Sequence, residues 1–375
     1  MEIKITPSGT TPFFFGRTLY DGDREAMFFN WTASGFALNF YGDHLAMDAT
    51  AFADHFPGES ENLPWIAVFV DGRGEPARTL RLHEGRGVYP LFESERAAEH
   101  TLRVVKRTEN SKGSVGVHRL LLGGEPRPYA PPPRRRLEFV GDSITCGFGN
   151  AMAADATTFT TGLEDGLAAY PAVTAELLEA DYQSVCISGI PLCHPSDPAF
   201  RMRLPEFPDF TPPARAMETL YAYTDREYQE AAGVKEGFEP WDFGRFRPHA
   251  IILNLGTNDA FRISVSGNDP AEEAHFRRRY TAFLHQLRRL NGPGPVIACT
   301  LGPMNYFLYD TVEKAVEAYR GETGDGRVFC LKFGAIDPWG EGYGGLAHPN
   351  LKTHARMGRE LAAALRPWLT GEEKA

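Results

Sequence analysis

Leu137-Glu-Phe-Val-Gly-Asp-Ser-Ile-Thr-Cys-Gly-Phe-Gly-Asn150 is a short apolar run followed by a loop that holds a serine and three glycines. The run from Leu137 to Val140 predicts a buried strand that breaks at Gly141, so Ser143 should lie at the end of a sheet. Loops at the carboxyl ends of parallel strands are where catalytic groups can converge. A serine hydroxyl is a weak nucleophile until a base removes its proton and donors stabilise the negative charge made by its attack. Gly-Asp-Ser alone also fits an ordinary turn, so its meaning depends on the rest of the chain.

Downstream of this stretch, strand-like and helix-like segments alternate. Pro270 marks a first helical turn, and one face of the following segment carries Phe276, Tyr280, Phe283, Leu284 and Leu287, which predicts a helix to residue 290. The other expected elements are helices at 171–180, 312–319 and about 350–365, and strands at 185–187, 250–255, 295–300 and 328–333. Residues 190 to about 218 are rich in proline and predict an insertion loop. The alternation predicts an α/β domain of three layers, with helices on both faces of a mostly parallel sheet.

The first 122 residues show a different pattern. Phe36, Leu38 and Phe40 alternate with other residues, and turn pairs such as Gly42-Asp43 and Asp71-Gly72 separate this segment from the next ones. Such a pattern predicts an antiparallel β-sandwich of the jelly-roll type. Residues 123–136 are rich in proline and arginine and predict a stiff linker. The expected organisation is therefore a sandwich at 1–122, a linker at 123–136 and an α/β domain at 137–375.

Composition restricts the classes of function. The chain has 375 residues, with 39 basic and 49 acidic side chains and a net charge of -10, which argues against general binding of nucleic acid or anionic membranes and suits a neutral substrate. Its five cysteines form no zinc-type pairs, so we expect reduced thiols and neither a metal site nor a cofactor. The N-terminus lacks the pattern of a secretory signal, and no apolar run approaches transmembrane length, which predicts a cytoplasmic protein.

Four short motifs follow predicted strands: Gly141-Asp-Ser143, Ser188-Gly189, Gly256-Thr-Asn-Asp259 and His348-Pro-Asn350. Ser143 can supply a nucleophile and, with its own N–H, one donor to an oxyanion. Gly189 lets the backbone approach a ligand closely. Asn258 offers a side-chain amide donor, and His348 an imidazole that can accept the serine proton. Each motif occurs in ordinary turns, but their joint occurrence after strands indicates a serine hydrolase.

These motifs resemble the four blocks of the SGNH (GDSL) hydrolase superfamily, and Gly-Asp-Ser-Ile-Thr and Leu-Gly-Thr-Asn-Asp are the specific ones. The preceding β-sandwich, with residues 101–108, 240–243 and 302–304, is similar to carbohydrate esterase family 2. The resemblance implies an acetyl esterase that acts on plant oligosaccharides or polysaccharides of the xylan or mannan type through an acetyl-serine intermediate. It implies an oxyanion hole made by Ser143, Gly189 and Asn258. It also implies that Asp142, Tyr170 and Met304 contribute to substrate binding.

The chain departs from the superfamily beside the histidine. An aspartate commonly stands three residues before it, where this chain has Gly345, and family 2 members often have an aromatic residue where this chain has Ala347. Some family 2 esterases use a Ser–His dyad whose imidazole is oriented by a backbone carbonyl, and we favour that arrangement here. Asp337 or Glu341 could instead reach Nδ1. His354 is the rival base, but its place in the last helix favours a packing role.

Two other classes of function remain as alternatives. A general lipase or thioesterase is disfavoured because the chain has no Gly-x-Ser-x-Gly elbow and no long apolar loop to hold an acyl chain. A catalytically silent glycan-binding protein would use the sandwich as its binding module. The presence of both Ser143 and His348 argues against the silent protein.

Overall fold

The computed structural model describes residues 1–6, 9–53, 62–193, 215–265 and 267–370, and the chain divides into two compact units. The β unit comprises Met1–Pro133, Thr160–Gly162 and Thr224–Glu239, and the α/β unit comprises Arg134–Phe159, Leu163–Tyr223 and Pro240–Ala375. The sequence-based division placed all of 137–375 in one domain. The structure differs in grouping two short later segments with the β unit.

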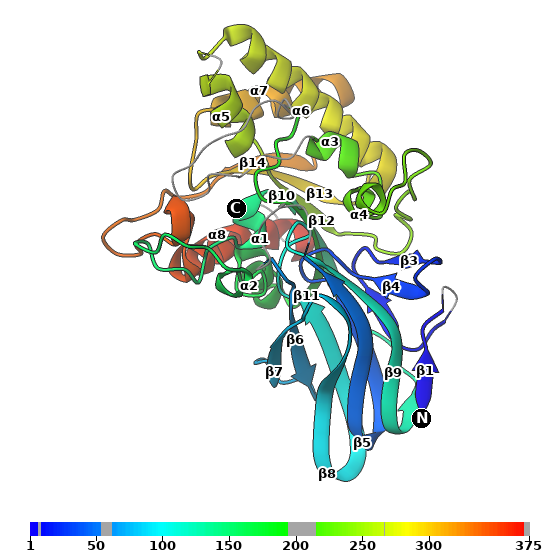
Figure 1. The fold of residues 1–375 in the computed structure, drawn as a ribbon. Helices are drawn as coiled ribbons and strands as arrows, with labels where there is room; N and C mark the ends of the chain where they lie inside the picture. The colour runs from blue at the N-terminus through cyan, green and yellow to red at the C-terminus, as the bar shows by residue number, and fades with distance from the viewer. Residues whose placement is uncertain (7–8, 54–61, 194–214, 266, 371–375) are drawn as a thin grey trace. The chain divides into compact units, whose positions relative to one another are not determined.

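In the described residues the β unit has nine strands, and Figure 1 shows the longest of them, β5, β8 and β9, running side by side. Its strands are β1 (Glu2–Lys4), β2 (Phe13–Phe15), β3 (Leu19–Asp21), β4 (Ala26–Phe28), β5 (Gly35–Phe52), β6 (Trp65–Val70), β7 (Arg78–Arg81), β8 (Gly85–Lys106) and β9 (Ser114–Arg127). Neighbours in the order β3-β4-β9-β5-β8-β6-β7 are paired, with β1 on β9 and β2 on β5. All these pairings are antiparallel.

A bulge in β5 changes which residues face the core. Before it, Phe36, Leu38 and Phe40 are buried at even positions, and after it Leu45 and Met47 are buried at odd positions. The register against β8 and β9 shifts between residues 42 and 44, and an extra residue at a bulge moves the alternation by one and bends the strand. Both halves of β5 therefore contribute to one hydrophobic core.

Hydrogen bonds tie the segment Thr224–Glu239 into the β unit. Asp225 is 2% exposed and accepts hydrogen bonds from Asn30 Nδ2 at 2.8 Å and Asn110 Nδ2 at 3.1 Å. The indole of Trp31 donates to Thr224 O at 2.9 Å. Helix α4 (Arg226–Ala231) begins directly after this contact. A buried polar network thus fixes a segment that lies far beyond the sandwich strands in the sequence.

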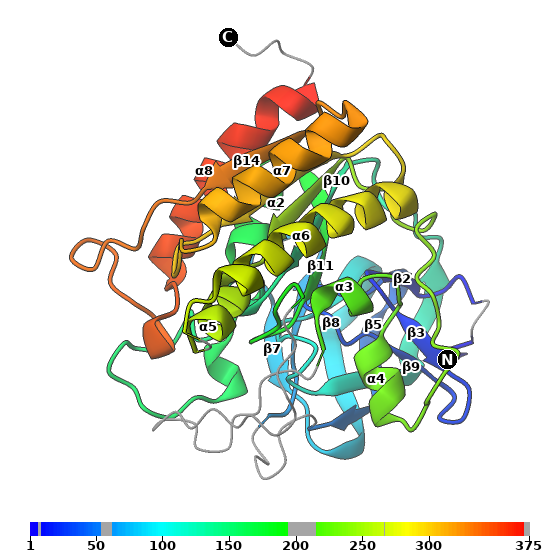
Figure 2. The ribbon, with the colours of Figure 1, turned by 90° about the horizontal axis from the view of Figure 1, so that it is seen from above.

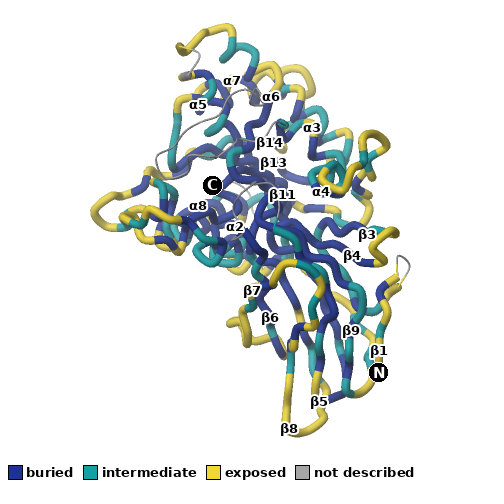
Figure 3. The backbone as a smooth tube through the Cα atoms, in the orientation of Figure 1, coloured by how far each residue is buried: buried dark blue, intermediate teal, exposed yellow. Residues whose placement is uncertain are grey.

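The part of the α/β unit that the structure describes contains a five-stranded sheet, and all of its strand pairings are parallel. Its strands are β10 (Arg135–Gly141), β11 (Ala180–Cys186), β12 (Ala250–Asn254), β13 (Val296–Leu301) and β14 (Val328–Lys332), in the order β11-β10-β12-β13-β14. The connection between the two sheets is shorter than the predicted linker, because β9 continues to Arg127 and β10 begins at Arg135. The central strands are buried along their whole length, as Figure 3 shows in dark blue.

Helices cover both faces of this sheet. Residues of α2 (Tyr170–Leu177) and α8 (Leu351–Thr370) share a core with Leu137 and Phe139 of β10. Helices α6 (Pro270–Asn291) and α7 (Tyr309–Thr323) lie side by side in Figure 2 and contact each other through Thr281 and Ala315. Tyr280 of α6 contacts Cys299 of β13. Ala298, the residue before Cys299, faces the core shared with α2 and α8, so Cys299 faces the opposite side of the sheet. The predicted three layers are confirmed.

Short helices complete the described part: α1 (Ser143–Cys146), η1 (Thr161–Leu163), α3 (Met217–Leu220), α5 (Thr257–Val265) and η2 (Gly345–Ala347). The insertion loop that the prolines predict at 190 to about 218 lies for its larger part, 194–214, outside the described residues. None of the described helices is long and apolar enough to cross a membrane.

Candidate active site

Strand β10 delivers Ser143 at its carboxyl end. The strand ends at Gly141, and helix α1 begins at Ser143. Position 141 needs a glycine, because a Cβ atom there would lie 2.0 Å from the side-chain oxygen of Thr145. The Asp142 carboxylate caps the helix by accepting a hydrogen bond from Ile144 N at 3.0 Å. Ser143 is thereby fixed at the first turn of α1, with 9% of its surface exposed.

His348 reaches Ser143 from the segment that connects η2 to α8. Its Nε2 atom lies 2.9 Å from Ser143 Oγ, although the two residues are 205 positions apart in the chain. Phe148, just beyond α1, packs beside the imidazole with ring centroids 4.9 Å apart. The structure therefore brings together the two residues that the sequence predicted as nucleophile and base.

A backbone carbonyl orients the imidazole. His348 Nδ1 lies 3.1 Å from Leu346 O, and a carbonyl oxygen can only accept, so Nδ1 carries the proton. The neutral ring then presents its lone pair at Nε2 to the Ser143 hydroxyl. Leu346 and Ala347 both adopt left-handed backbone conformations, with φ of 51° and 59°, which turn the Leu346 carbonyl back toward the ring that follows it.

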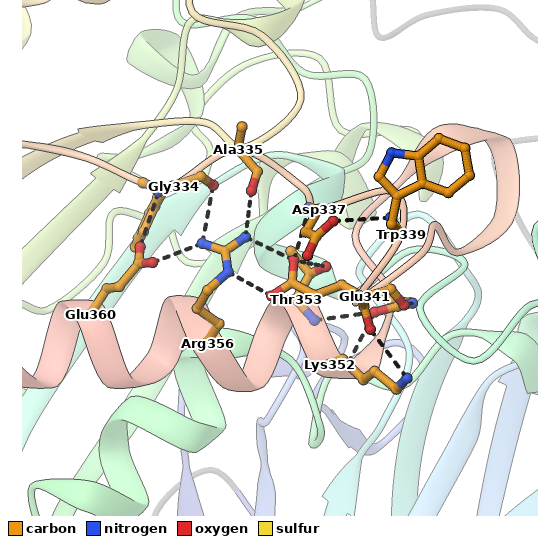
Figure 4. Close-up of polar contacts among 12 residues, drawn as sticks. Gly334, Ala335, Asp337, Trp339, Glu341, Lys352, Thr353, Arg356 and Glu360 are labelled. Atoms are coloured by element: carbon orange, nitrogen blue, oxygen red, sulfur yellow. Dashed lines mark hydrogen bonds and ion pairs between the residues drawn. The ribbon is translucent and has the colours of Figure 1, made fainter.

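The two carboxylates that were the alternative partners of Nδ1 are engaged elsewhere, as Figure 4 shows. Asp337 Oδ1 accepts a hydrogen bond from Trp339 N at 3.0 Å. Glu341 pairs with Arg356 of α8 through Nε at 2.6 Å and Nη2 at 3.0 Å. The hydrogen bonds from Arg356 hold the pKa of Glu341 below its ordinary value. The geometry thus matches the dyad arrangement, and the role of Arg356 was not foreseen.

Two backbone N–H groups are candidates for binding an oxyanion. Within the part of the chain that the structure describes, neither Ser143 N nor Gly189 N donates a hydrogen bond. Gly189 has a φ of 76°, a left-handed conformation that glycine adopts without strain. Both donors therefore stay available to a ligand.

Asn258, the third predicted donor, follows β12 near the start of α5. Its Nδ2 donates to Asp142 Oδ2 at 3.2 Å and to Ile190 O at 3.0 Å. The amide thus connects the loop that holds Ser143 to the loop that holds Gly189. Both of its N–H groups are already directed at acceptors, so Asn258 would bind an oxyanion only by sharing or releasing one of them.

Asp259 has a structural role at the site that sequence reasoning did not assign. It is fully buried and accepts hydrogen bonds from Leu192 N at 2.7 Å and Cys193 N at 3.0 Å. Burial and the nearby Asp259 carboxylate raise the pKa of the Cys193 thiol, which donates to Asp259 at 3.6 Å. Asp259 thereby anchors the residues that follow Gly189. The sequence signal that could have indicated this role is the position of Asp259 directly after Asn258 in the Gly-Thr-Asn-Asp motif.

Of the three residues expected to bind substrate, Asp142 and Tyr170 are buried and Met304 is half-buried. Tyr170 has no exposed surface, and its hydroxyl lies 2.9 Å from Thr145 Oγ1, a hydrogen-bonding distance. Asp142 is 1% exposed, with its carboxylate used by α1 and by Asn258. Their contacts within the protein give both residues a positioning role at the site, and their contribution to substrate binding stays a prediction. Met304 is half-buried and packs against the core of the α/β unit.

His354, the rival base, is a core residue. It is fully buried, accepts a hydrogen bond from Tyr170 N at its Nδ1 at 3.2 Å, and lies parallel to the Tyr170 ring. Burial, with a further contribution from His348, lowers the pKa of His354 to about 3. A histidine that is neutral and holds α2 against α8 matches the packing role that the sequence favoured.

No group of three or more His, Cys, Asp and Glu side chains in the described ranges is arranged to hold a metal ion. The five cysteines are free thiols; Cys330 is half-buried, and the other four are buried.

Comparisons with known proteins match the β-rich part and the α/β part of the chain to two different family models. Residues 14–132 match the model of the carbohydrate esterase 2 N-terminal family, and residues 139–356 match that of the GDSL-like lipase/acylhydrolase family. The chain is 29% identical over 344 residues to the cellulase/esterase CelE of Acetivibrio thermocellus, and this match covers 90% of this chain but only 37% of that protein.

Two further relatives are matched over most of their length. An acetylxylan esterase / glucomannan deacetylase of Cellvibrio japonicus is 29% identical over 309 residues, which covers 80% of this chain and 76% of that protein. The structure of a family two carbohydrate esterase from Clostridium thermocellum in complex with cellohexaose has a TM-score of 0.78 and 27% identity, and the match covers 96% of this chain and 99% of that one. The predicted order of a β-rich domain followed by an α/β domain is confirmed.

Proposed function

This chain belongs to the GDSL-like lipase/acylhydrolase family, as its motifs implied, and we propose that it is a serine esterase that removes O-acetyl groups from carbohydrates of the xylan or mannan type. The observation that carries the proposal is the 2.9 Å contact between Ser143 Oγ and His348 Nε2, in a ring whose other nitrogen is fixed by Leu346 O. This is the distance at which a base can accept the proton of a nucleophile.

In the first half-reaction, His348 Nε2 takes the Ser143 proton as Oγ bonds to the acetyl carbonyl carbon. The tetrahedral intermediate collapses when the bond from that carbon to the sugar oxygen breaks. The imidazolium gives its proton to the sugar oxygen, which leaves a free sugar hydroxyl and acetyl-Ser143. In the second half-reaction, His348 takes a proton from water, the water oxygen attacks the acetyl carbon, and Ser143 leaves with the proton as acetic acid is released.

The N–H groups of Ser143 and Gly189 donate hydrogen bonds that stabilise the negatively charged oxygen of each tetrahedral intermediate. One such donor lowers a barrier by about 2.7–4 kcal/mol in a related arrangement. We assign Asn258 as the third donor, with one amide N–H turning from Asp142 Oδ2, the longer of its two contacts, toward the oxyanion. Asp142 then acts on the reaction through the position of Asn258.

The carbohydrate part of the proposal is supported by the relatives. One of them is named for the deacetylation of xylan and glucomannan, and another was solved with a cellohexaose chain bound. The β unit, which matches the N-terminal model of carbohydrate esterase 2, extends this likeness beyond the hydrolase part. These likenesses favour a sugar acetate over a long-chain acyl ester.

Acetate release measured by mass spectrometry tests the proposal. The wild-type protein should remove acetyl groups from acetylated xylo- and manno-oligosaccharides and act poorly on long-chain 4-nitrophenyl esters. Ser143→Ala should lose this activity and keep its fold, because the change removes one oxygen without opening a cavity in the core. Intact acetylated sugars beside rapid hydrolysis of long-chain esters would contradict the proposed substrate class.

A further inference from the structure

An apolar cluster packs against the segment that holds the catalytic histidine. Phe148, Met152 and Phe159 are buried and form its centre. The half-buried Leu346 packs against them, and Phe148 also lies beside the imidazole of His348. The cluster therefore contacts both the base and the residue whose carbonyl orients the base.

The carbonyl of Gly149 joins this cluster to the histidine segment. It accepts hydrogen bonds from Met152 N at 3.1 Å and from Gly345 N at 2.9 Å. Gly149 has a φ of 61°, a left-handed conformation that glycine adopts without strain. A Cβ atom at Gly344 would lie 2.6 Å from the same carbonyl oxygen. The backbone of the histidine segment is thus held close to the turn that carries Met152.

Met152 fills the space that a side chain at position 345 would need. A Cβ atom at Gly345 would lie 2.2 Å from Met152 Sδ, 2.8 Å from its Cγ and 3.0 Å from its Cβ. A movement of the sulfur alone leaves the contacts with Cγ and Cβ, and both are closer than ordinary van der Waals contact between carbon atoms. The SGNH pattern commonly has an aspartate at this position. In this chain an aspartate could enter there only by displacing Met152.

We propose that Met152 is a positioning residue for His348 and takes the place of that aspartate. It supports the backbone of Gly345, so that the left-handed turn at Leu346 and Ala347 is kept and the Leu346 carbonyl faces Nδ1. Met152 acts through the backbone and takes no part in proton transfer. The inference rests on the proposed function and deepens it, because it assigns an apolar support to the site where a carboxylate would supply charge.

The orienting carbonyl needs such a support. Left-handed non-glycine residues are strained and persist only where the surroundings hold them, and the bond from Nδ1 to Leu346 O in the neutral ring is weaker than a bond to a carboxylate. The hydrogen bond from His348 N to Gly345 O at 3.0 Å closes the turn but does not fix its place in the α/β unit. Packing on Met152 and the bond to Gly149 O supply that fixation.

The first test observes the imidazole itself. The ring nitrogen chemical shifts of His348, assigned by their loss in His348→Ala, report which nitrogen carries the proton at a pH where the ring is neutral. The wild type and Met152→Leu should show the Nδ1–H form, because leucine still supports Gly345. Met152→Ala should show a mixture of both forms, because the Leu346 carbonyl loses its fixed place. An undiminished Nδ1–H form in Met152→Ala would overturn the inference.

Steady-state kinetics test whether this orientation affects turnover. Met152→Ala should lower kcat for an acetylated oligosaccharide about tenfold and leave KM nearly unchanged, since a misplaced base slows the chemical step. Met152→Leu should restore most of kcat. Met47→Ala is the matched control, because Met47 is a fully buried methionine of β5 and its truncation destabilises a core that is remote from the base in the fold. An equal loss of kcat in Met47→Ala and Met152→Ala would contradict a positioning role.

A double-mutant cycle tests the claim that Met152 closes position 345. Gly345→Asp should lower the activity of the wild type about a hundredfold, because the new side chain clashes with Met152 and displaces the turn. In Met152→Ala the same change should cost about tenfold less, since contacting residues are not additive. Only the 3.0 Å contact with Cβ remains there. Equal losses in the two backgrounds would show that Met152 does not close this position.

The outcomes separate this inference from the proposed function. The chemical shifts are measured without substrate, so a tautomer that depends on Met152 in a protein that deacetylates no sugar would support the positioning role and refute the proposed function. A wild type that deacetylates sugars, with Met152→Ala keeping either the wild-type tautomer or the wild-type kcat, would overturn the positioning role and leave the proposed function in place.

Discussion

At the scale of single residues, the decisive feature is the carbonyl of Leu346. It occupies the place beside His348 Nδ1 where a serine hydrolase often has a carboxylate. Two consecutive non-glycine residues in left-handed conformations cost of the order of 1–3 kcal/mol each, and the hydrogen bond from Gly345 N to Gly149 O at 2.9 Å helps to hold them. The carbonyl fixes the tautomer but carries no full negative charge, so it stabilises the imidazolium less than a carboxylate would.

This arrangement predicts how the neighbouring acidic residues respond to substitution. His348→Ala should be nearly inactive because no other base faces Ser143 in the geometry described. Asp337→Asn and Glu341→Gln should keep most of the activity, since neither side chain orients the imidazole. Steady-state kinetics on an acetylated oligosaccharide, with circular dichroism to check folding, measures this. A loss of two or more orders of magnitude, about 3 kcal/mol, in a folded amide variant would identify a triad.

His354 gives a second prediction at this scale. Its folded pKa of about 3 lies below the ordinary value of 6.5, so between these pH values the unfolded state binds a proton that the folded state does not. Stability is then lost as the pH falls from about 6.5 toward 3, by as much as about 5 kcal/mol.

His354→Asn tests this account. The Asn side-chain oxygen can replace Nδ1 as acceptor for Tyr170 N, and the variant does not titrate. We expect activity within about threefold of the wild type and a shallower loss of stability in acid, measured by urea unfolding at several pH values. An inactive but folded variant would instead make His354 part of the catalytic machinery.

At the scale of elements, the start of α8 ties the fold to the site. Asn350 Oδ1 accepts hydrogen bonds from Lys352 N at 3.0 Å and Thr353 N at 3.1 Å, and its Nδ2 holds Glu341 O. The residue therefore caps the last helix and also fixes the turn that precedes His348.

Asn350→Ala should remove both functions, and Asn350→Asp only the second. We expect the alanine variant to lose about 1–2 kcal/mol of unfolding free energy, as for other lost caps, together with part of its kcat. The aspartate variant should recover most of the stability because its carboxylate still caps the helix. Denaturant unfolding and kcat of both variants measure this, and equal stability of the alanine variant and the wild type would contradict the capping role.

Local sequence patterns predicted most of the elements but not their finer contacts. Strand β12 and helix α6 lie close to their expected bounds because buried apolar runs and a first-turn proline are strong local signals. Helix α5 was missed because Gly256-Thr-Asn-Asp has the composition of a turn. The polar contacts of Tyr170 and Arg356 depend on residues far away in sequence, so local patterns could not predict their burial or their partners.

At the scale of the whole molecule, two units share the chain in a way that sequence composition did not reveal. The contacts of Asn30 and Asn110 with Asp225 span 195 and 115 positions, and no periodic pattern predicts them. The order of the domains was predictable because a segment of strands with alternating apolar residues is followed by a segment in which strands and helices alternate. The return of Thr224–Glu239 to the β unit was not.

Asp225 makes the β unit sensitive to pH. Burial raises its pKa from 3.8 to about 6, so between these values the folded state binds a proton that the unfolded state releases. Stability from this group is present below about pH 4 and is lost as the pH rises to about 6. The shift of about two pH units corresponds to about 3 kcal/mol.

Asp225→Asn should remove this slope. The variant also loses one hydrogen bond to Asn30 or Asn110 at every pH, which lowers its stability by a constant amount, so the slope is the quantity to compare. Thermal unfolding of the wild type and the variant between pH 4 and 6 measures it. Parallel curves for the two proteins would show that Asp225 does not titrate in this range.

The central claim is that Ser143 carries the acetyl group during removal of an acetyl ester from a sugar. The most direct measurement is peptide mapping by mass spectrometry after rapid acid quenching of the protein during turnover of acetylated xylotetraose. We predict an added acetyl group on the peptide that contains Ser143, and neither this label nor acetate release in Ser143→Ala. An acetyl group on a different side chain, or acetate release by Ser143→Ala at the wild-type rate, would contradict the account.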